Sequence, residues 1–282
     1  MPMDGLTLSF AAREINSCIA GGRIDRITQP EKDAIVLLIR AGSTNYKLLL
    51  CASPNNARLH FTNQHYANPL EPPMFCMLLR KQLTSGRITA VRQIAGDRVI
   101  HIDIDTVDEM GDHVVRRLIL EIMGRHSNLI LVDGENRILD AARHVSPDMS
   151  RVRQVQPGLP YLAPPAQDKL DPADITADKL LEYLTRAGNV PLHKAIAASI
   201  SGMSPVSARE LAFRVLARGE DRSDDLRATA ARLSDLLHRL PEMTAPRVLL
   251  DDSGDPVDVF AFPYLMHPLE AQAAAPTISA AL

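Results

Sequence analysis

A polar turn separates two apolar runs in the stretch EIMGRHSNLILVDG, residues 121–134. The first run stops at Gly124, and the second resumes as LILVD. Between them lie four side chains that donate or accept hydrogen bonds: Arg125, His126, Ser127 and Asn128. Because a tight hairpin turn needs only Gly and Asn, these extra groups predict a recognition edge. The alternative is that they only satisfy backbone groups at a crowded sheet end.

Charged residues on either side of this turn bear on the same prediction. Glu121 lies in an apolar strand, where an unpaired carboxylate is costly, so we expect Arg125 or Arg98 to be its partner. Asp97 and Arg98 precede the strand-like run RVIHIDI. An arginine in such a turn can stack on a base or hold a phosphate. In the alternative interpretation, Asp97 caps the turn and Arg98 is solvated.

Other chemistry has little support in the sequence. Pro2, once exposed by removal of the initiator methionine, could attack an aldehyde as a Schiff-base nucleophile, but Met3 rather than an acid follows it. The 3 cysteines and 9 histidines show no metal-ligand spacing, and no phosphate-binding loop or nucleophile motif is present. We therefore expect no metal, no cofactor and no catalysis.

Residues 195–212, IAASISGMSPVSARELAF, have the form of a helix, a glycine-centred turn and a second helix. This is the helix-hairpin-helix pattern, whose turn can offer backbone N–H groups to a phosphate. DNA-binding versions carry a second glycine where this chain has Ser204. An ordinary pair of antiparallel helices is therefore the alternative.

The elements that position these residues follow two patterns. Residues 5–20 space their apolar side chains at helical intervals and end at Gly21 and Gly22. Short apolar runs separated by turn residues then predict antiparallel strands, with one helix that opens at the double proline 72–73. Several runs are apolar throughout, which predicts a sheet that is buried on both faces.

A proline-rich connector, residues 146–172, marks the expected domain boundary. Helical patterns follow it, with starts expected at Asp174 or Thr176 and at Ser204. The tail predicts a hairpin that turns at DSGD. The last stretch, AQAAAPTISAAL, is expected to carry no closing element, as in a fragment of a longer protein.

Composition places the chain among soluble globular proteins, since 46% of its 282 residues are hydrophobic and 23% are charged. A net charge of −3 excludes a global basic field, so any nucleic-acid surface must be a local patch. Unpaired cysteines and the lack of a signal peptide favour a reducing cytoplasm. No apolar stretch is long enough to cross a membrane.

Long motifs run nearly unbroken over residues 3–172, among them MDGLTLS, GGRIDRITQPEKDAIVLLIR, NPLEPPMFCMLLRKQL, LILEIMGRHSNLILVD and ILDAARHVSPDMSRVRQVQPGLPY. They closely resemble the N-terminal domain of the NFACT family, which includes bacterial RqcH-like proteins and eukaryotic NEMF. The resemblance implies an α+β fold, in which an antiparallel β-sandwich-like domain similar to that of formamidopyrimidine-DNA glycosylase precedes a small helix-hairpin-helix domain. The expected domains are residues 1–172, residues 173–245, and residues 246–282 with a C-terminal hairpin and the start of a linker to a coiled coil.

The same resemblance implies a factor of ribosome-associated quality control. Such a factor binds the large ribosomal subunit and its rRNA beside a stalled peptidyl-tRNA, and recruits tRNA, mainly alanine tRNA, for untemplated C-terminal tailing. The ribosome performs peptide transfer, so the chain is expected to be no enzyme. The family's tRNA-binding motifs match Asp97, Arg98, Glu121, Ile122 and Met123, to which we add Arg125, His126, Ser127 and Asn128.

Two other functions remain as alternatives. The first is a DNA glycosylase or lyase that uses Pro2. The second is a surface adhesin that binds fibronectin, as an older name for the bacterial family members suggests.

Overall fold

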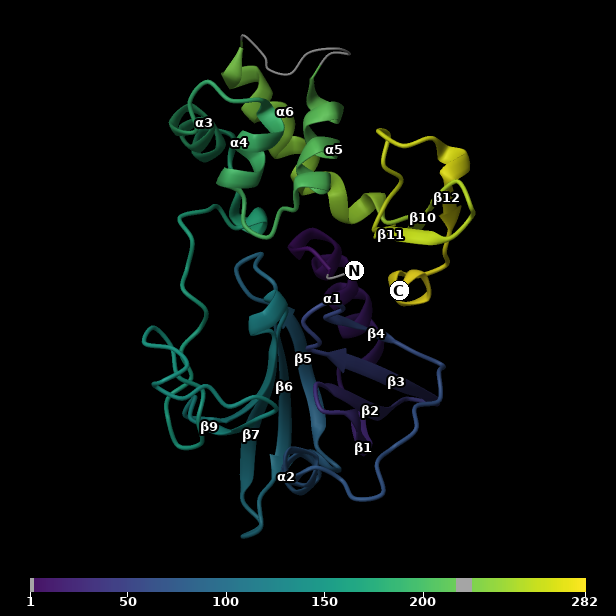
Figure 1. Ribbon diagram of the computed structural model, residues 1–282, viewed down its shortest axis with the longest axis vertical. Coiled ribbons are helices and arrows are strands. Elements are labelled where there is room, and N and C mark those ends of the chain that lie inside the picture. Colours follow the sequence, from purple (N-terminus) through teal and green to yellow (C-terminus); the bar gives the residue numbers. More distant parts are fainter. Residues whose placement is uncertain (1–2, 217–224) are drawn as a thin grey trace. The chain divides into compact units, whose positions relative to one another are not determined.

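The computed structural model describes residues 3–216 and 225–282, which form two compact units (Figure 1). Most of the first unit is residues 11–94 and 98–166. The second unit is residues 4–10, 95–97 and 167–282. The passage from one unit to the other between residues 166 and 167 lies within the proline-rich connector. The helical region and the C-terminal hairpin, which the sequence divides at residue 245, belong to the same unit.

Antiparallel strands dominate the first unit. Within the described residues they form one sheet of 9 strands in the order β4-β3-β2-β1-β5-β6-β7-β8-β9. The strands are β1 Arg23–Glu31, β2 Ala34–Ala41, β3 Thr44–Cys51, β4 Arg58–Phe61, β5 Arg87–Gln93, β6 Val99–Val107, β7 His113–Glu121, β8 Asn128–Asp133 and β9 Ile138–Ala141. The antiparallel strand series that the sequence predicts is confirmed.

The two halves of this sheet meet where β1 pairs with β5, through Arg23 and Arg87. Backbone bonds continue the junction, because Ile24 donates to the Gly86 carbonyl at 2.9 Å and Ile88 donates to the Gly22 carbonyl at 2.8 Å. The strand pairing therefore forms one continuous sheet. The predicted likeness to a sandwich and to the glycosylase domain stays a prediction.

Strand β8 is buried on both faces of the sheet, as its sequence predicts. All four residues from Leu129 to Val132 on β8 have 0% exposure. One face carries an apolar cluster formed by Val99, Ile119, Ile130, Val132, Ile138, Ala141, Val155 and Tyr161. The last two come from the connector, so this irregular segment covers the sheet instead of merely linking domains.

Two helices complete the N-terminal region. Helix α1, Gly5–Ile19, begins after Asp4, whose carboxylate accepts from the Thr7 N–H at 2.8 Å. Its residues from 11 onward belong to the first unit, where Ala11, Ile15 and Ile19 are fully buried at four-residue spacing. Helix α2, Met74–Leu83, follows the predicted double proline.

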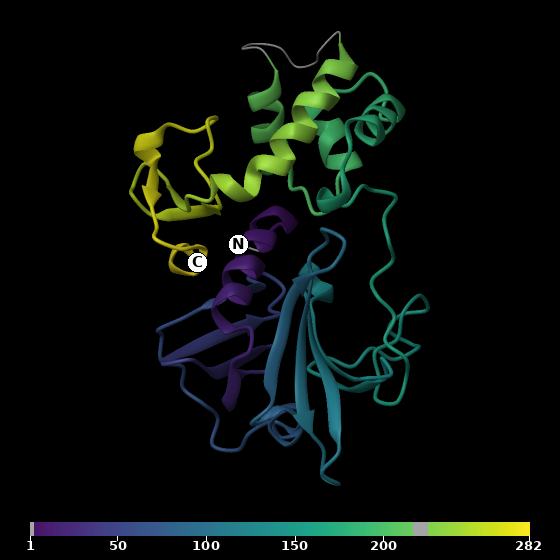
Figure 2. The ribbon, with the colours of Figure 1, turned by 180° about the vertical axis from the view of Figure 1, so that it is seen from behind.

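The second unit contains a helical bundle, coloured green in Figure 2. Its main helices are α3 Ala177–Arg186, α4 Leu192–Ser199, α5 Pro205–Val215 and α6 Leu226–Arg239. Thr176 caps α3 by accepting from Lys179 N at 3.3 Å, and Ser204 caps α5 by accepting from Ser207 N at 3.1 Å. Both starts were predicted. No helix in the described part of the chain is long and apolar enough to span a bilayer.

The tail of the second unit is ordered to its end. Strands β10, Arg247–Leu250, and β11, Pro256–Phe260, form the predicted hairpin. Strand β12, Gln272–Ala274, pairs with the other edge of β10, and helix α7, Ile278–Ala281, follows. The expectation that the last stretch carries no strand or helix was wrong. Residues 272–274 form a strand because the fold brings them beside the open edge of β10, which supplies the hydrogen-bonding groups.

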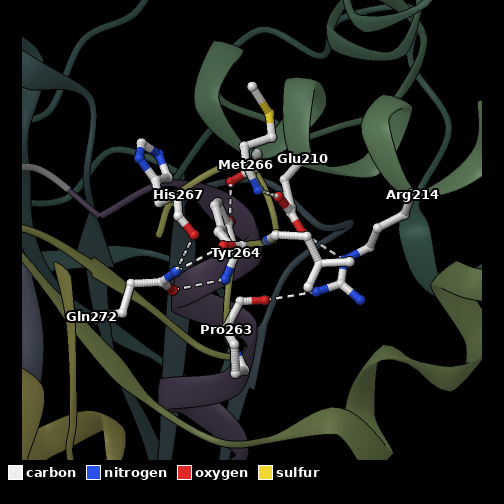
Figure 3. A network of polar contacts seen from close by, with 9 residues as sticks. Glu210, Arg214, Pro263, Tyr264, Met266, His267 and Gln272 are labelled. Atoms are coloured by element: carbon white, nitrogen blue, oxygen red, sulfur yellow. Dashed lines mark hydrogen bonds and ion pairs between the residues drawn. The ribbon is translucent and has the colours of Figure 1, made fainter. Parts of the chain in front are cut away.

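A buried carboxylate ties helix α5 to the chain before β12 (Figure 3). Glu210 has 0% exposure and accepts from the Arg214 guanidinium at 2.6 Å, from Leu265 N at 2.9 Å and from Met266 N at 3.1 Å. Arg214 also donates to the Pro263 carbonyl at 2.6 Å. The pair thereby satisfies backbone groups that a loop would otherwise leave to water.

Three glycines from distant parts of the sequence meet in the second unit. Gly202, in the turn between α4 and α5, accepts from Gly5 N at 2.7 Å. A β-carbon built on Gly202 would lie 2.1 Å from the Gly96 carbonyl oxygen, and Gly202 has a φ of +71°. The turn therefore uses its glycine for close backbone contact within the chain. Binding of a phosphate there stays a prediction.

We predict that Gly202→Ala is far more destabilising than Gly254→Ala. Gly254 has a φ of +83° with no atom within 4 Å of a built β-carbon, so alanine there should cost only about 1–2 kcal/mol of backbone strain. Alanine at Gly202 adds a clash with backbone, which should cost about 2 kcal/mol more. Urea unfolding of both variants measures the difference, and equal losses would contradict the close contact.

Candidate functional site

The predicted site residues of the first unit lie at one end of three adjacent strands. Val99 at the start of β6 pairs with Glu121 at the end of β7, which pairs with Asn128 at the start of β8. Ile122 N donates to the Arg98 carbonyl at 2.8 Å, which extends the pairing by one residue. We call this region, residues 98 and 121–128, the sheet-end edge. Asp97 belongs to the second unit and Arg98 to the first.

Glu121 is buried, with only 1% exposure, and its partner is Arg153. The guanidinium donates through Nη1 to Oε2 at 2.8 Å and through Nη2 to Oε1 at 2.5 Å. The Tyr161 hydroxyl donates to Oε1 at 2.8 Å. The predicted pairing with Arg125 or Arg98 was wrong, because Glu121 points to the sheet face that the connector covers.

Burial and charge both act on the pKa values of this group. Burial would lower the pKa of Arg153, but the hydrogen bonds and charge of Glu121 outweigh it and raise the pKa. Burial, followed by the charge of Glu121, raises the pKa of Tyr161 well above its usual range, so its hydroxyl remains a donor. The Arg153 guanidinium carbon also lies 5.2 Å from the centre of the Tyr161 ring. These contacts hold the connector on β7.

The turn itself is a short 3-10 helix, Gly124–His126, in which Gly124 has a φ of +56°. The Ser127 hydroxyl accepts from Met123 N at 2.9 Å. The Asn128 side chain accepts from Arg143 N at 3.0 Å and donates to the Arg143 carbonyl at 2.8 Å. Both side chains are buried and make the backbone contacts that the structural alternative describes. Any role of theirs toward a ligand stays a prediction.

Other side chains at the sheet-end edge reach the surface. Arg125 and His126 are exposed, and the Arg125 Nε donates to the His126 Nε2 at 3.0 Å. Arg98 and Met123 are half-buried, with the Arg98 Nη2 3.8 Å from the Met123 sulfur. Ile122, in contrast, has 0% exposure. The predicted residues therefore fall into two groups. Some are buried and support the edge, and others have side chains that reach the surface.

Three residues of this site escaped the sequence analysis. Arg153 and Tyr161 neutralise and cover Glu121, and Arg143 is held by Asn128 and donates to the Arg125 carbonyl. The sequence had predicted Arg125 or Arg98 as the partner of Glu121. The arginine-rich run SRVR in the connector was the available signal. Pro2 lies outside the described residues. Within residues 3–216 and 225–282, no group of three potential metal ligands occurs.

His101 lies on the same covered face, with its ring 6.3 Å from the Tyr161 ring. Burial, followed by the nearby Arg117 guanidinium, lowers the pKa of His101 to about 4. Arg117 itself pairs with Asp103 at 2.6 Å, and Arg92 pairs with the other oxygen of that carboxylate. The imidazole is therefore neutral at physiological pH.

Residues 4–282 match the family model described as NFACT N-terminal and middle domains. The Rqc2 homologue RqcH of Bacillus subtilis (strain 168) is 46% identical over 216 residues, which are 76% of this chain and 38% of that protein. The ribosome quality control complex subunit NEMF of Homo sapiens is 28% identical over 138 residues, 49% of this chain and 12% of that protein. The chain thus spans well under half the length of these relatives.

Two solved structures resemble the whole chain. The N-terminal part of the fibronectin/fibrinogen-binding protein from Streptococcus suis has a TM-score of 0.81 at 32% identity, and the match covers 98% of this chain and 96% of that one. The fibrinogen binding protein from Staphylococcus aureus has a TM-score of 0.82 at 31% identity, covering 99% and 97%.

We predict that Glu121→Gln destabilises the chain by about 3–5 kcal/mol, because it leaves the Arg153 cation buried without its counter-charge. The matched control is Glu135→Gln. Its ion pair with Arg137, at 3.6 Å, joins side chains that are 82% and 60% exposed, so a change within about 0.5 kcal/mol is expected. Chemical denaturation measures both. Similar losses in the two variants would show that the buried pair stabilises the fold no more than the exposed pair does.

We predict that His101 makes the fold sensitive to acid. Its pKa in the folded chain, about 4, lies below the ordinary value of 6.5, so its contribution is present above pH 6.5 and is lost as pH falls toward 4. The loss should be roughly 2 kcal/mol after allowance for partial solvent screening. Between pH 7 and pH 4.5, the free energy of unfolding should decrease less in His101→Gln than in the unchanged chain. Parallel pH profiles would refute this.

Proposed function

The chain belongs to the NFACT family, and from this membership we propose that it is an RNA-binding factor of ribosome-associated quality control. The relatives RqcH and NEMF support the proposal, since NEMF is named as a subunit of the ribosome quality control complex. In this role the chain helps to bind a large ribosomal subunit that carries a stalled peptidyl-tRNA. It also helps to recruit tRNA, of the alanine type, for untemplated C-terminal tailing in the cytoplasm.

The single observation that carries the proposal is the construction of the sheet-end edge. Arg98, Met123, Arg125 and His126 reach the surface there. The end of β7 beneath them is fastened to the connector by the hydrogen bonds of the buried Glu121. Arginine presents a planar fork of donors that suits phosphate and also stacks on bases. A rigid edge with such groups is suited to select one RNA shape.

Residues of the edge then divide between contact and support. We assign tRNA contact to the outward-facing side chains and, by the family's motif, to Asp97. Glu121, Ile122, Ser127 and Asn128 support the edge from inside, because their side chains are buried. Substitution of a supporting residue should weaken tRNA binding only to the extent that it loosens the fold, which stability measurements can reveal.

The proposal makes the chain a binding factor and not a catalyst, because the ribosome supplies the peptidyl transfer reaction. A second candidate, binding of an extracellular matrix protein, is favoured by the two similar structures named for fibronectin or fibrinogen binding. Immobilised fibronectin and immobilised tRNA, offered to the same preparation, separate the two. A lyase acting through Pro2 would be trapped on abasic DNA by borohydride.

We predict that the chain binds tRNA with an affinity that falls steeply between low and physiological salt, because phosphate contacts release counterions. Arg98→Lys should weaken binding several-fold although the charge is kept, since lysine cannot copy a bidentate or stacked contact. Fluorescence anisotropy with labelled tRNA measures both effects.

The control for this experiment is Arg87→Lys, at the start of β5, where the guanidinium donates to the Gly21 carbonyl at 2.6 Å. It should leave tRNA binding unchanged. Melting temperatures of all variants exclude unfolding as the cause. Full tRNA binding by a folded Arg98→Lys variant would remove Arg98 from the interface.

A further inference from the structure

An open groove of about 210 Å³ lies on one face of β1, β2 and β3, in the half of the sheet that does not form the sheet-end edge. Arg26, Leu38 and Lys47 are on its floor, and Gln64, His65 and Tyr66 border it from the segment after β4. The space far exceeds what a single water needs. No carboxylate is among its lining side chains in the described part of the chain.

The strand register aligns two cations across this floor. Arg26 pairs with Leu38, and Leu38 pairs with Lys47 on the next strand, so the three side chains share one face. Two strand spacings separate the backbones of Arg26 and Lys47, or about 10 Å. Within residues 3–216 and 225–282, neither cation forms an ion pair with a carboxylate.

Neighbouring residues strengthen the positive charge of this face. Arg23 and Arg40 pair across β1 and β2, and both lie near Asp25, at 2.9 Å and 3.8 Å respectively. Together with Arg26 and Lys47 they make four cations, of which Arg23 and Arg40 share the Asp25 carboxylate. The whole chain carries a net charge of −3, so this basic cluster is a local exception to its surroundings.

An aromatic ring beside the cations is held in place from below. Tyr66 packs on a small apolar cluster formed by Ala34, Val36, Leu49 and Cys51, yet remains half-buried. Gln64 and Asn68 place amide groups that can both donate and accept at the same border. Cations, a supported ring and amides are the groups that proteins use to hold unpaired nucleotides.

We propose that this groove binds an unpaired segment of RNA, with phosphates on Arg26 and Lys47 and a base against Tyr66. The inference builds on the proposed RNA-binding function and adds a second contact surface, separate from the sheet-end edge. Binding depends on the backbone charge and on the flat face of a base, so it is tolerant of sequence. A duplex would not offer its bases to the ring.

The test is fluorescence anisotropy of the chain with a labelled single-stranded oligoadenylate of about ten nucleotides, a length within the range of known single-strand sites. Arg26→Ala/Lys47→Ala should bind at least tenfold more weakly and show a shallower salt dependence. Tyr66→Leu should weaken binding about threefold, and Tyr66→Phe, which keeps the ring, should not. Thermal unfolding confirms that each variant is folded.

The matched control is Lys81→Ala/Arg137→Ala, which removes the same two charges from exposed ion pairs outside the groove. It should bind within twofold of the unchanged chain. If an equal concentration of polyglutamate displaced the RNA, the groove would bind anions in general. That result would overturn the proposal.

Failure of this inference is distinguishable from failure of the proposed function. If the chain binds tRNA but the groove variants bind oligoadenylate normally, the groove is refuted and the function stands. If the unchanged chain binds neither RNA, both fail. Arg98→Lys should weaken tRNA binding and leave oligoadenylate binding intact, and equal effects on both RNAs would contradict two separate surfaces.

Discussion

Burial of the Glu121 carboxylate is the constraint on which the candidate site depends. A charge in an apolar sheet is tolerated only with a close counter-charge and a full set of hydrogen bonds, and Arg153 and Tyr161 supply both. Because those two residues come from the connector, the same contacts fasten an irregular segment over the sheet. The end of β7 cannot move without exposing or unpairing this group.

In the second unit, close contact between backbone segments likewise holds distant parts of the chain together. Gly5, Gly96 and Gly202 approach so closely that a β-carbon on any of them would meet another atom at 2.5 Å or less. Packing inside the chain therefore accounts for Gly202 in the turn between α4 and α5. Nearby, the Glu210 and Arg214 pair organises a loop through backbone N–H groups and a carbonyl. In both units, internal polar or backbone contacts hold segments that have no regular structure.

The family's motifs acquire separate physical meanings in this fold. In the segment EIMGRHSN, the buried pairs Glu121–Ile122 and Ser127–Asn128 stand on either side of Met123, Arg125 and His126, which reach the surface. A motif can thus mark a recognition edge although several of its residues face the interior. Substituting the whole segment would confuse loss of shape with loss of contact, whereas single conservative changes distinguish them.

Local patterns in the chain were enough to predict the strand series, helix α1 with its glycine stop, the caps at Thr176 and Ser204, and the hairpin before Phe260. Each depends on periodicity or capping within a few neighbouring residues. The partner of Glu121, the pairing of β12 with β10 and the groove between Arg26 and Lys47 depend on residues far apart in sequence. Only folding brings such residues together. The sequence around a buried charge shows that the charge needs a partner, but the packing of the entire sheet decides which residue lies close enough to be that partner.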